Sequence, residues 1–558
     1  MPTIQFKGKN VIWNHHLSIP YHTLDEVPEL DFRPDRSNGN IIIEGDNLLG
    51  LKALLPQFSG KIKCIYIDPP YNTGNEGWIY NDKVNSPLIQ AWLYHAVGGG
   101  EDLTRHDKWL CMMTPRLKLL RELLSEDGVI LISIDDNEAM NLKLLMDEVY
   151  GSENFIAQTV VQLNPRGRTL DRFLAKTHEY IFIYGKDAAN ESTMNLLEKS
   201  GKALNEYNKE DDEGKYRELE LRNRNPVFHR GNRPNLYFPL YVNPKSESVS
   251  LNKDKKHPVE VYPINSRGVD GCWTWGIDKV KKNINLLVGR KVSTGAWRIY
   301  RKDHLLKNGQ KALTKAKALW VEKEINNENG KERLNELFDH DLPFDFPKSI
   351  DLIKKCVVLG SGDNDIILDS FAGSGTTMDA IIDLNSQDGS NRKCIMIQMT
   401  ESTAEEPDKN ICKDITRERV KRAINKLEYD SGFKYFRIGQ PLDAETLLEG
   451  KLPSYNNFAK YVFYLCTGQN IKGNIKPNKN TWFIGDFGKQ SIHLIYEQDF
   501  NTLSKMALNL DIAEKIFSEH KGKKHIIYAP ACFLDDDYME DRQIDFVSIP
   551  YNLFQKKI

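Results

Sequence analysis

The stretch Asp68-Pro69-Pro70-Tyr71 directly follows an apolar run, IKCIYI, that is typical of a buried strand. The carboxylate accepts hydrogen bonds, and the two prolines remove backbone N–H donors from the turn. The tyrosine adds a flat face on which a planar base could stack. This loop would therefore suit a bound amino group, because it offers acceptors and few competing donors.

The chemistry that fits such a loop is attack by an exocyclic amine on an electrophilic carbon. The nitrogen lone pair of this amine is delocalised into its ring, so acceptors on its two hydrogens would favour the pyramidal geometry that frees the lone pair. Orientation and electrostatics would then supply the rate, with no metal or covalent intermediate. A plain Asp-Pro turn with a surface tyrosine is the alternative interpretation.

A second loop, FAGSGTT at residues 371–377, follows the strand-like run IILDS and precedes a helical pattern. Gly373 and Gly375 permit a tight turn, let a ligand approach the backbone, and expose N–H groups at the helix start. A phosphate loop would add a lysine, and a dinucleotide fingerprint a third glycine, so ATP and NAD are disfavoured. Glu401, after the next strand, could accept the hydroxyls of a ribose. A tight turn without a ligand is the alternative here.

Strands and helices alternate on both sides of these loops. A short strand at residues 41–43 is followed by a turn and a helix from about Leu48, and the same order returns over residues 365–398. This alternation predicts an α/β fold with a mostly parallel sheet covered by helices on both faces. Both loops would then lie at the carboxyl ends of strands, where open α/β sheets bind ligands.

The 558 residues suggest several domain-sized units. We expect the catalytic half of a core over residues 1–154 and an interrupted region, rich in basic and aromatic residues, over 155–340. The cofactor-binding half would follow over 341–431, and a small C-terminal α/β unit over 432–558.

Composition is typical of a globular protein, with 40% hydrophobic and 28% charged residues. No apolar run approaches the ~20 residues of a membrane span, and the N-terminus lacks a signal-peptide layout, so we expect a cytoplasmic protein. The eight cysteines are scattered without zinc-site spacing, and no metal is expected. At a net charge of −2, any nucleic-acid surface must be a local basic patch.

Together, DPPY and FAGSGTT resemble the amino-group DNA methyltransferases that use S-adenosylmethionine, and their order resembles the β class of that family. Further stretches, among them IEGDNLLGLKAL, GEDLTRHDKWLCMMTPRLKLL, DGVILISIDDNE, HEYIFIY, FDFPKS and FVSIPYNLF, resemble the modification (Mod) subunits of type III restriction-modification systems. The resemblance extends over nearly the whole chain. It implies a Rossmann-like methyltransferase core with an inserted target-recognition domain at 155–340.

The resemblance also implies roles for individual residues. In that family the Asp and the first Pro carbonyl of DPPY hold the target amine and the Tyr stacks on the flipped base, which gives the catalytic set Asp68, Pro69, Pro70 and Tyr71. The expected cofactor-binding residues are Asp46, Asn47, Lys348, Asp369, Phe371, Ala372, Gly373, Ser374, Gly375, Thr376, Thr377 and Glu401. This chain departs from the family pattern in having Ser349 after Lys348 and no proline before Glu401.

The expected DNA contacts comprise two residues after DPPY and a set of arginines: Asn72, Thr73, Arg166, Arg168, Arg222, Arg224, Arg230 and Arg233. Extruding a base costs a few kcal/mol, which phosphate and flanking-base contacts must offset. For each single arginine, a solvated charged face is an equally good interpretation.

The predicted function is N6 methylation of adenine in double-stranded DNA by a homodimer. The protein would act either as the modification subunit of a type III-like system, with a restriction (Res) nuclease-helicase partner, or as an orphan relative. Cytosine-N4 methylation is the first alternative, although that branch more often has Ser at the position of Asp68. An RNA substrate is another. A third is a specificity subunit that recruits a nuclease-helicase without catalysis, against which the intact Asp68, Tyr71 and Gly373 argue.

Overall fold

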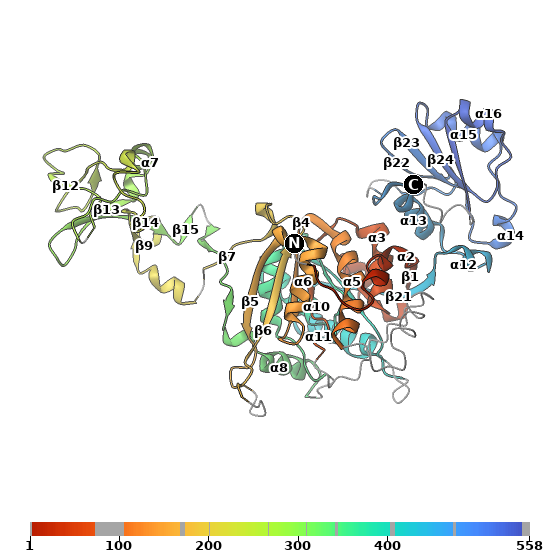
Figure 1. Ribbon diagram of the computed structural model, residues 1–558, viewed down its shortest axis with the longest axis horizontal. Helices are drawn as coiled ribbons and strands as arrows, with labels where there is room; N and C mark the ends of the chain where they lie inside the picture. Colours follow the sequence, from red (N-terminus) through yellow and green to blue (C-terminus); the bar gives the residue numbers. More distant parts are fainter. Residues whose placement is uncertain are drawn as a thin grey trace. The chain divides into compact units, whose positions relative to one another are not determined.

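The computed structural model describes residues 3–72, 105–167, 173–199, 201–265, 267–307, 310–340, 344–401, 408–471 and 476–549. The chain divides into two compact units (Figure 1). One comprises Met1–Asn195 and Lys317–Ile558, and the other comprises Leu196–Ala316.

A ten-stranded sheet is the centre of the first unit. Its strands, in spatial order, are β1 (His22–Glu26), β21 (Lys434–Pro441), β2 (Ile41–Glu44), β20 (Lys393–Gln398), β19 (Ile366–Asp369), β3 (Ile62–Ile67), β4 (Leu124–Ile134), β6 (His178–Gly185), β5 (Phe155–Gln162) and β18 (Leu319–Trp320). From β21 to β4 all neighbours are parallel, whereas β6 and β1 run antiparallel to theirs. The predicted α/β fold with a mostly parallel sheet is confirmed.

Helices pack on the sheet in two groups. One group holds α3 (Asn47–Phe58), α5 (Arg105–Leu123) and α6 (Ala139–Tyr150), and the other holds α8 (Asn327–Leu337), α9 (Ile350–Gly360), α10 (Thr376–Asp388) and α11 (Glu418–Lys426). The pleat of β3 separates them, because alternate side chains of a strand point to opposite faces. Ile65 and Ile67 belong to the core shared with α3, α5 and α6, whereas Cys64 faces Gly360 of α9, where an added Cβ would lie 2.6 Å from its Sγ.

Every residue of β3 is buried. Continuous burial is expected of a parallel strand that is covered by helices on both faces, and it explains why this strand is apolar throughout and not alternating. The strand therefore delivers the polar residue that follows it, Asp68, to a fixed position.

The unit Leu196–Ala316 has its own core around Trp273 and Trp275. Its larger sheets are antiparallel, in the orders β13-β14-β9-β8 and β11-β10-β12. The elements are β7 (Leu197–Glu198), β8 (Lys209–Asp211), β9 (Gly214–Glu220), β10 (Leu240–Val242), β11 (Val249–Ser250), β12 (Val259–Val261), α7 (Ile277–Lys282), β13 (Leu287–Lys291), β14 (Trp297–His304), β15 (Leu306–Lys307), β16 (Gln310–Lys311) and β17 (Leu313–Thr314).

This unit is narrower than the range 155–340 expected for target recognition. β5 and β6, which open that range, complete the central sheet of the other unit, with β6 paired to β4. The apolar run in β6 indicated a strand, but its partner could not be known from the sequence because an antiparallel strand can join either sheet.

The C-terminal residues form a smaller α/β layer, as expected, with a sheet in the order β22-β23-β24-β25. It begins later than residue 432, because β21 belongs to the central sheet. Its elements are α12 (Ala444–Leu448), α13 (Tyr455–Thr467), β22 (Phe483–Phe487), β23 (Gln490–Leu494), α14 (Phe500–Leu503), α15 (Leu510–Glu519), β24 (Lys524–Ala529), α16 (Asp536–Asp541) and β25 (Ile544–Ser548). Among the described residues, no helix is both long enough and apolar enough to span a membrane.

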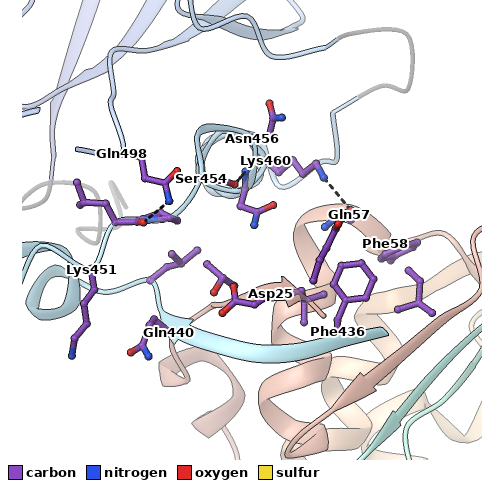
Figure 2. Close-up of a pocket in the computed structure, with 18 of the residues that line it drawn as sticks. Asp25, Gln57, Phe58, Phe436, Gln440, Lys451, Ser454, Asn456, Lys460 and Gln498 are labelled. Carbon is purple, nitrogen blue, oxygen red and sulfur yellow. Dashed lines mark hydrogen bonds between the residues drawn. The ribbon is translucent and has the colours of Figure 1, made fainter. Parts of the chain in front are cut away.

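A cavity of about 910 Å³ is lined by residues of β1, β21, the end of α3 and the start of α13. Figure 2 shows its polar lining, in which Lys460 of α13 reaches Gln57 of α3 at 3.3 Å. None of its lining residues belongs to the DPPY loop or the glycine loop. This cavity therefore lies away from the two loops for which the sequence predicts chemistry.

Candidate active site

The two predicted loops lie next to each other at one edge of the central sheet. β3 and β19 are parallel neighbours with Ile65 opposite Leu368, and DPPY and FAGSGTT begin just after these strands end. From this pair the chain continues to β4 on one side and to β20 on the other. The loops thus meet at the topological switch point, where open α/β sheets form their ligand crevices.

Asp68 is the first residue after β3, and its side chain is 27% exposed. Its Oδ1 lies 2.8 Å from the Tyr71 hydroxyl and 3.5 Å from Nζ of Lys348. Burial raises the pKa of Asp68, and the Lys348 ammonium offsets part of that rise. The turn is fixed by Trp109, whose indole N–H donates to the Pro70 carbonyl at 2.7 Å.

Lys348 and Glu179 complete this side of the site. Nζ of Lys348 donates to the Tyr71 hydroxyl at 2.6 Å and to Oε2 of Glu179 at 2.7 Å. Burial by itself would lower the pKa of Lys348, but the carboxylates of Asp68 and Glu179 outweigh it and raise that pKa. The structure thus places Lys348 beside the DPPY loop, and its predicted part in cofactor binding stays a prediction.

Glu179 was not predicted from the sequence. The available signal was an acid in the otherwise apolar run of β6, since a charged residue is rarely buried without a partner. That signal indicates that a partner exists, but Lys348 is far away in the sequence.

Asn72 lies under the loop and not on its surface. It is buried, has a left-handed φ of 55°, and its amide donates to Glu138, a fully buried carboxylate that also contacts Nδ1 of His106 at 2.7 Å. Pro69 is buried as well. These contacts hold the end of the turn, and the predicted contact of Asn72 with DNA gains no support from this burial. Thr73 lies outside the described residues.

The glycine loop is shaped by its backbone. Asp369, at the end of β19, accepts hydrogen bonds from the Phe371 N–H at 2.9 Å and the Thr377 hydroxyl at 2.5 Å, and burial raises its pKa to about 7. Gly373 and Gly375 have φ values of 50° and 83°, a region in which residues with a Cβ are strained. The turn therefore depends on glycine at both positions.

Two side chains from neighbouring elements fix Gly373. Its N–H donates to Oε1 of Gln398 at 2.7 Å, and its carbonyl accepts from the Thr416 hydroxyl at 2.6 Å. An added Cβ on Gly375 would meet the Thr416 carbonyl at 2.9 Å. Ala372 is buried beside them.

A buried ion cluster supports the loop from behind. Arg419 of α11 donates to the hydroxyls of Ser374 and Thr376 at 2.8 and 2.7 Å and to Asp379 at 3.0 Å. Arg333 of α8 donates to the same carboxylate at 2.8 Å. Arg419 and Asp379 are fully buried, so Ser374 and Thr376 are bound by the protein itself.

Glu401 follows β20, and its backbone is left-handed, with φ 57°. Its Oε1 accepts from Nε2 of Gln398 at 2.8 Å, so one glutamine links this acid to Gly373. Burial raises the pKa of Glu401. Glu401 is thus a half-buried carboxylate one strand away from the glycine loop, and its contact with a ribose stays a prediction.

Asp46 and Asn47 start α3. Asp46 caps the helix by accepting from the Leu48 N–H at 2.8 Å, while the Asn47 amide donates to the Ser370 carbonyl at 2.9 Å and so reaches the glycine-loop strand. Arg116 of α5, fully buried, donates to Oδ1 of Asn47 at 2.6 Å and approaches Asp46 at 3.4 Å. Sequence reasoning missed Arg116, although a charged residue within an apolar helical stretch indicated a buried partner.

These donors and acceptors fit S-adenosylmethionine. At Gly373 the left-handed turn leaves room for the methionine part of the molecule, since a Cβ built there would meet described atoms only at ordinary contact distances, Phe344 at 3.5 Å and the Phe371 carbonyl at 4.0 Å. Glu401 supplies an acceptor for ribose hydroxyls. The side chain of Asp46, 30% exposed, adds a second carboxylate for a cationic or hydroxyl group.

The predicted DNA-contacting arginines differ in their surroundings. Arg222 is held by the buried Glu220 at 3.0 Å, which favours a structural role. Arg224 and Arg230 are 76% and 61% exposed with carboxylates at 3.2 Å, and Arg233 lies over the Phe228 ring. Arg166 is 84% exposed, and Arg168 lies outside the described residues. Their roles in DNA binding stay predictions.

The fold and site define an α/β protein in which an acidic loop and a glycine loop follow two adjacent parallel strands. A family model described as DNA methylase matches residues 62–409. This protein belongs to the DNA methylase family.

Curated relatives are of two kinds. The chain is 34% identical to the type III restriction-modification enzyme EcoPI Mod subunit of Escherichia phage P1 over 66% of this chain and 58% of that one. It is 32% identical to the type II methyltransferase M.KpnI of Klebsiella pneumoniae over 67% of this chain and 84% of that one. Among solved structures, the cytosine-N4-specific PvuII DNA methyltransferase is 12% identical with a TM-score of 0.32, covering 71% of this chain and 94% of that one.

Proposed function

We propose that this protein is a site-specific DNA methyltransferase that transfers a methyl group from S-adenosylmethionine to N6 of an adenine extruded from double-stranded DNA. The observation that carries the proposal is the position of Asp68 beside the glycine loop, at the switch point of a sheet in a chain of the DNA methylase family. The proposed acceptor for the amine and the proposed loop for the nucleoside then follow two adjacent strands.

S-adenosylmethionine, when bound, would supply a methyl group on a positively charged sulfur. The residues that would hold it are the glycine loop from Phe371 to Thr377, with Asp46, Asn47, Asp369 and Glu401. The chain's part in the reaction is to place the amine: the Asp68 carboxylate accepts a hydrogen bond from the N6 amino group, and the Pro69 carbonyl accepts a second. Tyr71 offers its ring to the base.

Asp68 must be ionised for this role, because a protonated carboxyl would place an O–H donor against the amine. Burial raises the pKa of Asp68 and so favours the neutral carboxyl. The Lys348 ammonium opposes this effect, because a nearby positive charge favours the ionised carboxylate. The rate would then come from orientation and fixed charge.

Adenine is favoured over cytosine by the aspartate at position 68. Several relatives are named as Mod subunits of type III systems, which supports a role as the modification subunit of such a system. We extend the proposal to a homodimer that recruits a restriction (Res) subunit, with Leu196–Ala316 reading the target sequence through exposed arginines such as Arg224 and Arg230.

The experiment is methylation of DNA by the purified protein, followed by analysis of modified nucleosides and by single-molecule sequencing. Wild type and Asp68→Ala are compared with Asp414→Ala, an exposed acid outside the site, as the matched control. N6-methyladenine in one short motif with wild type and the control, but not with Asp68→Ala, supports the proposal. N4-methylcytosine would overturn the choice of base, and no methylation with an added Res partner would favour the specificity-subunit alternative.

A further inference from the structure

A buried ion pair, Glu179 with Lys348, lies against Asp68. Glu179 comes from β6 and Lys348 from the residues before α9, and their side chains are only 18% and 10% exposed. Both contact the Tyr71 hydroxyl, which also contacts Asp68. Two carboxylates therefore share one hydroxyl and one ammonium.

The carboxylates of Asp68 and Glu179 compete for the proton of the Tyr71 hydroxyl. The Tyr71 hydroxyl has one proton, and it lies 2.8 Å from Oδ1 of Asp68 and 2.7 Å from Oε2 of Glu179. An ammonium donates only, so Lys348 occupies a lone pair of the hydroxyl oxygen and leaves its proton to one carboxylate at a time. When that proton points to Glu179, Oδ1 of Asp68 stays free to accept from another donor.

The charges also favour Glu179 over Asp68 as the partner of Lys348. Nζ of Lys348 lies 2.7 Å from Glu179 but 3.5 Å from Asp68, so its stronger bond goes to Glu179. Hydrogen bonds between charged groups are short and strong. Without the charge of Glu179, Asp68 would be the remaining anionic partner of the ammonium among these contacts, and the ammonium would compete with the base for Oδ1 of Asp68.

We propose that Glu179 is a positioning residue that keeps Asp68 available to the target amine, by binding the Lys348 ammonium and accepting the Tyr71 hydroxyl proton in place of Asp68. This inference rests on the proposed methyl transfer and adds a residue to it. Lys348 is then the side chain that moves. Held by Glu179, it favours the ionised form of Asp68 from a distance, and released from Glu179, it competes with the amine for Oδ1 of Asp68.

The test is Glu179→Gln, which keeps the size of the side chain and an acceptor oxygen but removes the charge. We expect kcat to fall about 10–100-fold, the range that loss of a charged hydrogen bond covers, with the dissociation constant for S-adenosylmethionine unchanged. Adding Lys348→Met to this variant should restore much of the lost rate at a pH above the acidic limb, where Asp68 is ionised without the cation, because the competing ammonium is gone. Additive losses in the double variant would overturn the proposal.

The pH profile separates positioning from a structural role. The charged and titratable groups facing Asp68 are Lys348, Glu179, Tyr71, Tyr66 and Asp369. Glu179→Gln removes a like charge and brings the cation closer, so the acidic limb of the rate should move to lower pH. Lys348→Met should move it to higher pH. Limbs that stay in place, or that move in the same direction, would contradict the inference.

Asp147→Asn is the matched control. Asp147 also accepts from a tyrosine hydroxyl and an ammonium, those of Tyr184 at 2.8 Å and Lys143 at 2.6 Å, but it lies on α6, outside the site. Its substitution should leave the pH profile of methyl transfer unchanged. A similar displacement of the acidic limb in this variant would show that the effect is not specific to the site.

A structural measurement does not depend on turnover. In a crystal structure of Glu179→Gln, Nζ of Lys348 should approach Asp68 to about 2.8 Å, the usual length of such a bond. An ammonium that stays in its wild-type position would overturn the inference even if the rate falls. A wild-type enzyme that methylates no DNA would instead refute the proposed function. The position of Lys348 in the variant would still show whether Glu179 and Asp68 compete for its ammonium.

Discussion

The two loops of the candidate site, after β3 and after β19, are built differently. On the side of β3, the polar groups are charged side chains with more than one possible partner: Asp68 and Glu179 compete for the proton of the Tyr71 hydroxyl, and Lys348 donates to the oxygen of the same hydroxyl. On the side of β19, the glycine loop presents backbone, and its own hydroxyls are bound by the buried Arg419. The difference suggests that one side is fixed before a ligand arrives, whereas the other must exchange partners when a base enters.

The largest expected effect is on the exchangeable side. Asp68→Ala should lower kcat for methyl transfer by about 10²–10³-fold or more, because a preorganised charge at the reacting amine is lost. Binding of S-adenosylmethionine, measured by calorimetry, should change less than about twofold, since the carboxylate acts on the base. A parallel loss of cofactor affinity would contradict the separation of the two sides.

On the fixed side, Arg419→Met should destabilise the fold. The substitution leaves the fully buried Asp379 with one partner in place of two, and breaking a buried pair costs about 3–5 kcal/mol. The free energy of unfolding in urea measures it. Arg422→Met, on the same helix but 39% exposed and paired with an exposed acid, is the control and should cost no more than about 1 kcal/mol.

The two glycines that flank α10 test whether the glycine loop is held rigidly. Gly375 and Gly389 have φ values of 83° and 72°, but a Cβ on Gly375 would lie 2.9 Å from the Thr416 carbonyl, while a Cβ on Gly389 would have no atom within 4 Å. Alanine at Gly389 should therefore cost about 1 kcal/mol of backbone strain. Alanine at Gly375 should cost more and also weaken cofactor binding roughly tenfold, because the loop must shift. Equal cofactor affinity in the two variants would show that the loop is not fixed.

The smallest expected effect concerns the pH dependence of stability. Burial raises the pKa of Asp369 from 3.8 to about 7, so the folded state holds this proton more tightly than the unfolded state. The stabilisation is complete below the unfolded value and is lost as the pH rises through about 7. Asp369→Asn should flatten this part of the profile, so that Tm differs less between acidic and alkaline buffer in the variant than in the wild type. An unchanged slope would mean that the acid is not protonated in the fold.

Much of the fold was predictable because its signals are local. The apolar run before Asp68 and the run before FAGSGTT each indicated a buried strand, and the glycines indicated the turn. Helical spacing between them implied a parallel sheet, and in such a sheet the ends of strands gather at one edge. The observed pairing of β3 with β19 follows that rule.

The extent of the inserted unit was less predictable. Residues 155–195 lie in the central unit, because β6 pairs with β4 and β5 pairs with β6 and β18, so that both extend the central sheet. The local sequence of an antiparallel strand does not indicate which strand it pairs with. The same holds for Glu179, whose place in the site depends on that pairing.

By itself, the sequence determined the kinds of chemical group at the crevice: a carboxylate and a tyrosine after one strand, and a glycine turn after another. Only the tertiary structure decided which charges meet there. Glu179 and Lys348 are 169 residues apart in the chain and lie 2.7 Å apart in space, and Arg419 reaches Ser374 across 45 residues. The physical reason is that a buried charge requires a partner whose identity depends on how the sheet and helices pack, and no local pattern carries that information.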